Sequence, residues 1–298
     1  MSSSRSHFRN VEFYDPANPG SDALGGFIQN GSVTEADFLH MLGIVLVVET
    51  PIRVQHRISR HVVSVINSRL AIGTYDIYCD SPVQLSNEPW IHRVISYNVS
   101  GREDAFRDGI RARDGRCVIS GVINMSAPFR WASFEAAHVF PLGSENLWIE
   151  WGYGQYITDM DDTVGVSRIN SCQNGFLLSQ HIHGLFDQYL LSVNPDVGDA
   201  DHPQQDGYKI TVFDNDIYGM DGRTLDPVCR DPSDPHRVSD QLLRWHFRQS
   251  VLANMRRAGE PVFESDFPPG TDMMREIQRG PYAKERLELE VAVRLKGL

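Results

Sequence analysis

The order of apolar and polar residues over the first hundred positions predicts one helix and several short strands. Residues 34–49 begin with Thr34 followed by acidic side chains, which is typical of the start of a helix. Residues 61–70, 73–80 and 90–99 are rich in β-branched and aromatic side chains and are separated by turn residues, so they predict strands. Together these elements predict a small α+β region.

The pattern then becomes helical and returns to short strands. Phe106 and Ile110 lie at helical spacing, and Gly115 ends the helix that they predict. Residues 117–121 and 134–143 predict short strands, the second closed by a proline and a glycine. This region is expected to alternate helix and strand.

The rest of the chain predicts further helices and one strand. Residues 174–193 repeat apolar side chains at helical spacing, whereas residues 208–214 predict a strand. A second amphipathic helix is expected to begin after Ser239 as its cap and to end at Gly259. A last helix is expected over 283–295.

These patterns divide the chain into three parts. Residues 1–100 are predicted to form an N-terminal α+β region, which opens with an irregular arm over residues 1–25 that is rich in Ser, Asn, Pro and Gly. Residues 101–260 are predicted to form a second, mixed domain. Residues 261–298 are predicted to form a C-terminal tail and helix.

Composition indicates a folded and acidic protein. Of 298 residues, 41% are hydrophobic and 22% are charged, which is typical of a globular protein with a core. The formal net charge is -11. Because phosphate contacts supply most of the affinity of nucleic-acid-binding proteins, this charge argues against nucleic acid as a dedicated partner.

Nothing in the sequence indicates export or a membrane. The N-terminal stretch lacks the apolar core of a signal peptide, and the longest apolar run, from Met41, is shorter than the roughly 20 residues of a membrane span. Cys79, Cys117, Cys172 and Cys229 form no CxxC motif, so neither a zinc knuckle nor a disulfide framework is expected. We expect a soluble, cytoplasmic protein with no membrane partner.

Three polar residues are suited to phosphodiester chemistry. His138 ends a predicted strand, Asn174 enters the next segment, and His183 lies nine positions later. In metal-dependent phosphodiester cleavage one imidazole takes a proton from water, and an asparagine amide holds the other nitrogen of that ring. A second histidine binds the divalent ion. The three residues are therefore candidates for a nuclease site.

The surroundings of these residues resemble a known family. The stretches "RDGRCVISG", "EAAHVFPLG" and "QNGFLLSQHIHGLFDQYLLSVNPD" are similar to the HNH, or ββα-metal, endonucleases in their fungal form, and the likeness covers roughly residues 8–260. It implies an α+β fold with an HNH/ββα-metal core, an N-terminal α+β region and C-terminal helices. It also implies that His138 is the general base, that Asn174 orients it, and that His183 binds a divalent metal (Mg, Mn or Zn).

The sequence departs from that family next to His138. Many HNH nucleases have an aspartate or histidine before the first histidine to complete the metal site, and this chain has Ala137. One histidine is a poor ligand set for magnesium, and zinc wants about three protein ligands at a catalytic site. Either Glu135 or Asp187 reaches the metal through the fold, or the metal site is weak or absent.

A second departure is the aromatic character of the residues around the same strand. These aromatic residues are Trp131, Phe134, Trp148, Trp151, Tyr153 and Tyr156. Such a cluster either walls an apolar pocket for a small molecule or packs the core, and the sequence leaves both possibilities open. In a pocket, His138 or Arg130 would donate a hydrogen bond to a substrate carbonyl.

Two functions follow from these observations. The first is an enzyme of terpenoid or polyketide biosynthesis that cyclises a small apolar metabolite, even by a pericyclic reaction, without a cofactor and with His138, Asn174 and Arg130 at its catalytic centre. The second is a metal-dependent HNH endonuclease, with nucleic acid as its substrate. A third function, non-catalytic interaction, has no positive support. The acidic composition favours the first function over the second.

Overall fold

The computed structural model describes most of the chain. The residues that it describes are 2–3, 5–91, 93, 101–159, 166–196, 207–260, 262–263, 284 and 287. None of the helices among them is long and apolar enough to cross a membrane. The expected boundary near residue 100 and most of the expected tail lie outside these residues, so the division into three parts stays a prediction.

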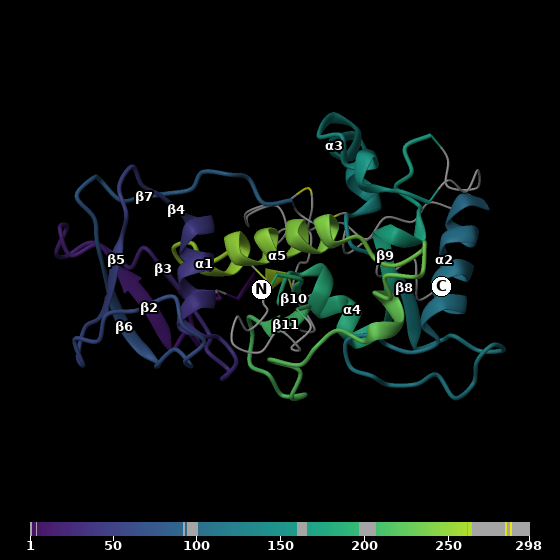
Figure 1. Ribbon diagram of the computed structural model, residues 1–298, viewed down its shortest axis with the longest axis horizontal. Coiled ribbons are helices and arrows are strands. Elements are labelled where there is room, and N and C mark those ends of the chain that lie inside the picture. The colour runs from purple at the N-terminus through teal and green to yellow at the C-terminus, as the bar shows by residue number, and fades with distance from the viewer. Residues whose placement is uncertain are drawn as a thin grey trace, which may run out of the picture.

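A four-stranded sheet and one helix form the N-terminal part of the molecule (Figure 1). The strands lie in the order β3, β2, β6, β5, with β2 parallel to β6 and the other pairs antiparallel. The helix α1 begins as predicted, because the Thr34 hydroxyl accepts from the Asp37 N–H and the Asp37 carboxylate accepts from the Thr34 N–H. The bounds are β2 (Val11–Tyr14), β3 (Gly25–Phe27), α1 (Glu35–Val45), β5 (Arg53–His56) and β6 (Gly73–Tyr78).

Two predictions for this part are wrong. β2 lies inside the expected irregular arm over 1–25 and is an inner strand of the sheet. Residues 61–70 form bends and isolated bridges, and the strand antiparallel to β6 is instead β5. β5 has Val54 as its one apolar residue, so no apolar repeat marks it. The strand predicted over 73–80 is confirmed as β6, and most of 90–99 lies outside the described residues.

Two antiparallel strands, β8 and β9, and the helix α4 after them form the next group of elements (Figure 1). The register places His138 of β8 opposite Gly175 of β9, and α4 follows β9 directly. α2 packs against both strands, and α3 lies in the long connection between them. The bounds are α2 (Gly101–Asp114), β8 (Phe134–His138), α3 (Glu145–Glu150), β9 (Gly175–Ser179) and α4 (Gln180–Asp187).

The single helix predicted over 174–193 is three elements, namely β9, α4 and β10. Residues 176–178 are three consecutive buried apolar side chains, and periodicity cannot distinguish a strand covered on both faces from a buried helix. His183 does lie in the helical part, as predicted. The strand predicted over 117–121 is a tight turn, in which the Gly121 N–H donates to the Cys117 carbonyl.

The remaining elements confirm the predicted strand over 208–214 and the helix that starts after Ser239. The helix ends at Met255, before Gly259, because the backbone becomes extended at Arg256. The helix predicted over 283–295 lies outside the described residues apart from Lys284 and Leu287. The bounds are β10 (Leu191–Asn194), β11 (Lys209–Val212), α5 (Asp240–Met255) and the two-residue strands β1 (Ser2–Ser3), β4 (Leu46–Val47), β7 (Gln84–Leu85) and β12 (Val262–Phe263).

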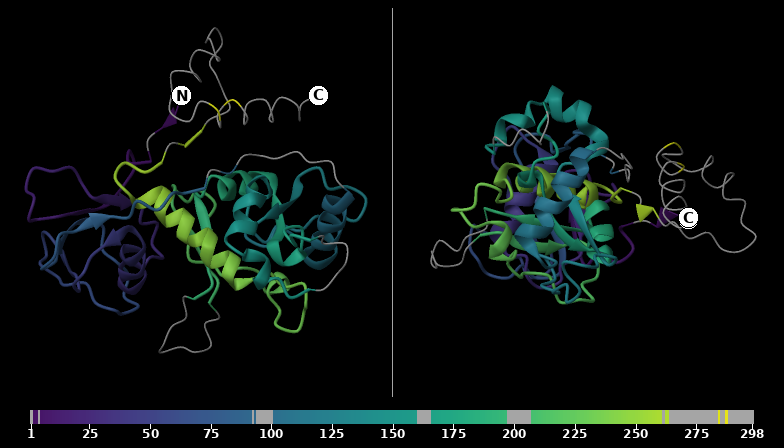
Figure 2. Two further views of the ribbon diagram at one scale, coloured as in Figure 1. Left: turned by 90° about the horizontal axis from the view of Figure 1, so that it is seen from above. Right: turned by 90° about the vertical axis from the view of Figure 1, so that its right-hand side faces the viewer.

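The helix α5 connects two hydrophobic cores. Its first half contributes Leu242 and Trp245 to the core around β8, β9 and α4, and its second half contributes Val251 and Met255 to the core of the N-terminal sheet. Figure 2 shows α5 lying between the two groups of elements. The helix therefore holds the N-terminal sheet and the β8–β9 strands in one arrangement.

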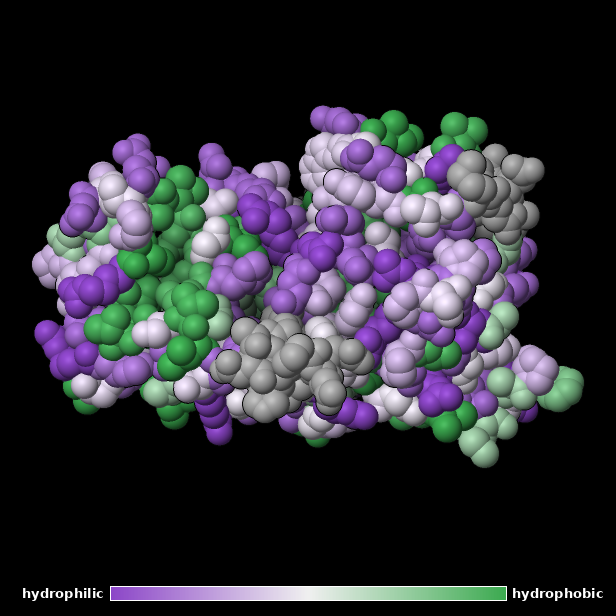
Figure 3. Space-filling view, in the orientation of Figure 1, coloured by the Kyte–Doolittle hydropathy of each residue, from purple (hydrophilic) through white to green (hydrophobic). Residues whose placement is uncertain are grey.

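One face of the molecule is most apolar over its N-terminal part. Figure 3 shows apolar side chains gathered over the N-terminal sheet and α1, whereas the rest of this face is more polar. The loop between β5 and β6 exposes Ile58, Val65 and Ile72. This apolar surface is at the opposite end of the molecule from β8, where the candidate site lies (Figure 1).

Candidate active site

His138 ends β8 and is held on two sides. Its ring stacks on Phe106 of α2, with 3.8 Å between ring centroids and 12° between planes. Its Nε2 donates to Oδ1 of Asn170 at 3.0 Å. Burial lowers the pKa of His138 to about 4. The ring is therefore neutral at pH 7, with its proton on Nε2 and its lone pair on Nδ1, as a general base requires.

Gly175 allows Phe106 to reach this histidine. A Cβ on Gly175 would lie 2.4 Å from the Phe106 ring and 2.6 Å from the Ala137 carbonyl oxygen. Since Gly175 is the register partner of His138, the absence of a side chain there leaves room for the stacked ring.

Replacing Gly175 by alanine is expected to lower the free energy of unfolding by about 1–3 kcal/mol, because the added methyl group displaces Phe106. Gly184→Ala in α4 is the matched control, since nothing lies within 4 Å of the Cβ that it adds. Urea unfolding of the two variants measures the difference. Equal stability of the two variants would show that the packing around Gly175 is loose.

Asn174 hydrogen-bonds to the backbone and not to His138, which is the partner that the resemblance implies. It is fully buried, and its Oδ1 accepts from the Phe140 N–H at 2.8 Å. Its Nδ2 donates to the carbonyls of Phe140 at 3.1 Å and Ile169 at 2.9 Å. Asn174 therefore ties the chain after β8 to the chain before β9, and Asn170 rather than Asn174 orients His138. No sequence signal separates these two asparagines.

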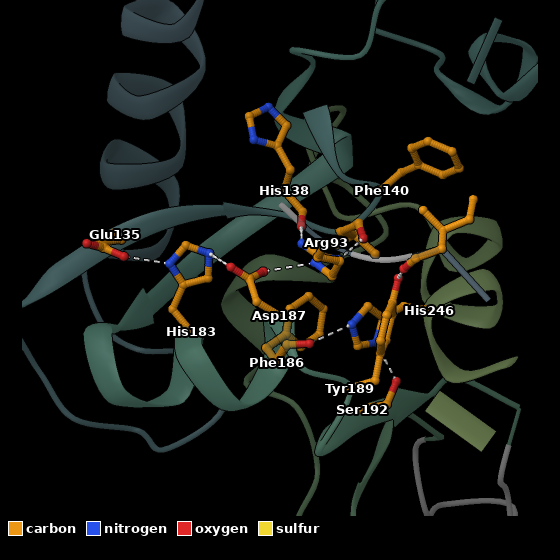
Figure 4. A network of polar contacts seen from close by, with 12 residues as sticks. Arg93, Glu135, His138, Phe140, His183, Phe186, Asp187, Tyr189, Ser192 and His246 are labelled. Carbon is orange, nitrogen blue, oxygen red and sulfur yellow. Dashed lines mark hydrogen bonds and ion pairs between the residues drawn. The ribbon is translucent and has the colours of Figure 1, made fainter. Parts of the chain in front are cut away.

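His183 lies between two carboxylates, away from the His138 ring (Figure 4). Its Nδ1 donates to Glu135 of β8 at 2.6 Å, and its Nε2 lies 3.3 Å from Asp187, one turn further along α4. Burial opposes a charge on the ring, but the carboxylates of Asp187 and Glu135 outweigh it and raise the pKa of His183. The hydrogen bond from His183 lowers the pKa of Glu135.

Arg93 completes this set of charges and was not predicted. Its Nε donates to Asp187 at 2.9 Å, its Nη1 donates to the Val139 carbonyl at 2.6 Å, and its Nη2 donates to the His138 carbonyl. Its side chain is only 4% exposed. Because these contacts join residues 45 to 94 positions apart, no local sequence pattern predicts them.

The arrangement does not fit a divalent metal ion. The two carboxylates nearest His183 approach opposite nitrogens of its ring, so the three groups do not converge on one point. In the described part of the chain, no three His, Cys, Asp or Glu side chains form a group that could hold a metal. His181 turns its ring toward Tyr218, and Ala137 is fully buried.

The predicted aromatic wall is largely packed on itself. Trp148 is 1% exposed, and its indole donates to the Ser167 carbonyl at 2.7 Å. Phe140 contacts the rings of Trp148, Tyr153 and Trp245 at centroid distances of 5.3, 5.1 and 4.4 Å. These side chains therefore fill the core beside β8, and their role in binding a substrate stays a prediction.

The remaining predicted residues lie at the edge of this core or outside it. Trp151 and Tyr156 are 40% and 38% exposed, and Phe134 is buried in β8. Tyr156 borders a hollow of about 350 Å³, whose other lining is mostly polar and does not include His138. The guanidinium of Arg111 covers Trp131. Arg130 is exposed and is not among the contacts of His138 described above.

A second buried histidine lies behind the Arg93 contacts (Figure 4). His246 of α5 stacks on Phe186 with 3.6 Å between centroids, and its Nε2 donates to the Phe186 carbonyl. Its Nδ1 accepts from the Ser192 hydroxyl at 2.7 Å. Burial lowers the pKa of His246 well below its ordinary value. A proton on Nδ1 would remove the Ser192 bond and bury a charge.

Stability is expected to fall as the pH drops from 6.5 toward 5. The unfolded chain binds protons at His138 and His246 in this range while the folded protein does not, so the slope approaches about 1.4 kcal/mol per pH unit for each histidine. His183 has a raised pKa, so its contribution is already complete below pH 6.5 and is lost only as the pH rises. Urea unfolding at a series of pH values measures the slope, and a flat profile would contradict it.

Comparison with known families agrees with part of the resemblance. A family model described as HNH endonuclease matches residues 117–194. This part of the chain is HNH-like. A second model, described as a domain of unknown function (DUF8573), matches residues 8–84. No curated protein and no solved structure matches the chain. The fungal form of the likeness stays a prediction.

The HNH-like segment contains most of the candidate site. His138, Asn174 and His183 lie inside 117–194, as do both carboxylates that flank His183. Arg93 and Phe106 lie outside it, so the segment before it supplies the buried cation and the ring that covers His138. The match supports a nuclease-type enzyme, and nothing observed supports a cyclase.

Proposed function

We propose that this protein hydrolyses phosphodiester bonds of nucleic acid, with His138 as the general base. The observation that carries the proposal is the state of this side chain: a neutral imidazole, restrained by Phe106 and Asn170, within a segment that matches HNH endonucleases. The match favours this function over the cyclisation that the aromatic cluster and the acidic composition suggested.

In the proposed hydrolysis, the catalytic and positioning groups are side chains of this protein. The Nδ1 of His138 takes a proton from a water molecule as the water oxygen attacks phosphorus. One P–O ester bond breaks, and the leaving oxygen takes a proton from solvent. Asn170 and Phe106 fix the tautomer and plane of the ring, so they are positioning residues. No step is assigned to a metal ion, because the residues around His183 do not fit one.

Electrostatics argue for weak substrate binding. The net charge is -11, and two arginines of α2 are already engaged: Arg107 pairs with Asp104 and Asp108, and Arg111 lies near Asp108. Phosphate therefore competes with carboxylates for these guanidinium groups, and affinity is expected to fall steeply with added salt.

A cleavage assay tests the proposal. The full chain is incubated at low salt with supercoiled plasmid, single-stranded DNA and RNA, each with EDTA, MgCl₂, MnCl₂ or ZnCl₂. A His138→Ala preparation, purified in the same way, is the control for contaminating nuclease. Cleavage by the wild-type protein that the variant lacks supports the proposal. Equal cleavage by both proteins, or none by either on all substrates, would refute it.

A further inference from the structure

We infer that the guanidinium of Arg93 takes the place of a divalent metal ion in the HNH-like segment, so that the segment holds its acidic site together without metal. The inference concerns how the site is held. It stands whether or not His138 hydrolyses nucleic acid.

The position of Arg93 is the first argument. Its guanidinium lies between the Asp187 carboxylate and the backbone at the end of β8, where it donates hydrogen bonds to the carbonyls of His138 and Val139 (Figure 4). One carboxylate and two carbonyl oxygens are the kind of ligand atoms that a hard metal ion such as magnesium prefers. Here the same three oxygen atoms accept hydrogen bonds from the Arg93 guanidinium.

The surroundings suit a guanidinium better than a hydrated ion. The Arg93 guanidinium carbon lies 5.1 Å from the Phe186 ring centre and 5.9 Å from that of Tyr189. A planar, weakly hydrated cation is attracted to aromatic faces, whereas magnesium retains several water molecules. With its side chain only 4% exposed, Arg93 occupies a place with little room for such a shell.

Each carboxylate of the network already has a partner without a metal. Arg93 contacts Asp187, Asp187 contacts His183, and His183 contacts Glu135. A divalent ion at His183 would have to displace one of these contacts in a mostly buried site, which is unfavourable.

The directions of the donors oppose a metal as well. A metal on His183 Nε2 would lie on the Asp187 side, and a metal on Nδ1 would lie on the Glu135 side. At either position the ion could be coordinated by only one of the two carboxylates. On the Asp187 side the ion would also compete with Arg93 for the same carboxylate. Binding on the Asp187 side therefore requires both ion pairs of Asp187 to rearrange.

Metal binding by the full wild-type chain tests the inference without any activity measurement. Protein treated with EDTA and desalted is titrated with MnCl₂, MgCl₂ and ZnCl₂ in a calorimeter, and its melting temperature is measured with each salt and with EDTA. No saturable binding and no shift in melting temperature are expected. Binding of one ion per chain that disappears in His183→Ala or Asp187→Asn would overturn the inference. These readouts do not depend on cleavage, so each proposal fails separately.

Arg93→Met is the complementary variant. It vacates the cation position and leaves Asp187 without its guanidinium partner, so MnCl₂ is expected to raise the melting temperature of this variant and not that of the wild type. The double variant Arg93→Met, Asp187→Asn is expected to lose that response. If Arg93→Met folds and its melting temperature does not change with MnCl₂, the inference that the guanidinium takes the place of a metal ion is wrong. If the variant does not fold, the wild-type titration still decides the question.

Discussion

Replacing Arg93 by methionine is expected to lower the free energy of unfolding by about 3–5 kcal/mol, because the change leaves a mostly buried carboxylate without its cation. Asp187 loses its guanidinium partner, and the carbonyls of His138 and Val139 lose their donors. Methionine keeps the apolar contact with Phe186 and so isolates the loss of charge and hydrogen bonds. Urea unfolding followed by circular dichroism measures the change.

Arg244→Met is the matched control for this prediction. Arg244 also pairs with an aspartate, Asp196, at 2.6 Å, but the two side chains are 40% and 46% exposed. Exposed ion pairs contribute about 0–1 kcal/mol, so this variant is expected to remain close to the wild type. If the two variants unfold at the same urea concentration, Arg93 is not the structural cation that its burial and contacts indicate.

The pattern of residues predicted the elements whose apolar side chains repeat on one face. α1, α2, β6 and α5 are such elements, and their positions agree with the prediction within a few residues. β9 and β10 were missed because buried strands and buried helices have the same apolar composition over five residues. β2 was missed because its neighbours are turn residues, although pairing with β6 places it inside the sheet.

The candidate site was only partly predictable for a different reason. His138, Asn174 and His183 are close enough in sequence to form a recognisable spacing. His138 and His183 lie in the predicted strand and helix, whereas Asn174 ends a short 3-10 turn before β9. What each side chain contacts depends on residues that the fold brings from elsewhere. Phe106 and Arg93 lie before the strand that they contact, and neither stands out by type or spacing.

The aromatic residues illustrate the same limit. Sequence identified them as apolar but could not determine whether they face a cavity or one another. The answer depends on Phe140 and Trp245, which come from two distant segments. Phe140 contacts both Trp148 and Tyr153, and Trp245 contacts Phe140 and Tyr153. The hypothesis of a small-molecule pocket required these rings to face an open cavity, whereas the preference for that function came from the acidic composition.

The largest effect on activity is expected from His138→Ala, which should lower the rate of phosphodiester cleavage by about 10²–10⁴-fold, the usual contribution of a general base. The variant keeps Asn174 and its bonds to Phe140, so the fold around β8 and β9 is retained. His181→Ala is the control, since this exposed ring contacts Tyr218 and not the network at His183. Its cleavage rate should equal that of the wild type.

The pH dependence of the wild-type rate separates catalysis by His138 from a structural effect of its loss. Because burial lowers the pKa of His138 to about 4, the base is already unprotonated at pH 5.5, and kcat should be nearly constant from there to pH 8. Asn170→Ala frees the ring to rotate, so it should lower kcat with little change in KM and without creating a new inflection. A rate that falls with a midpoint near 6.5 would assign the base to an ordinary exposed histidine instead.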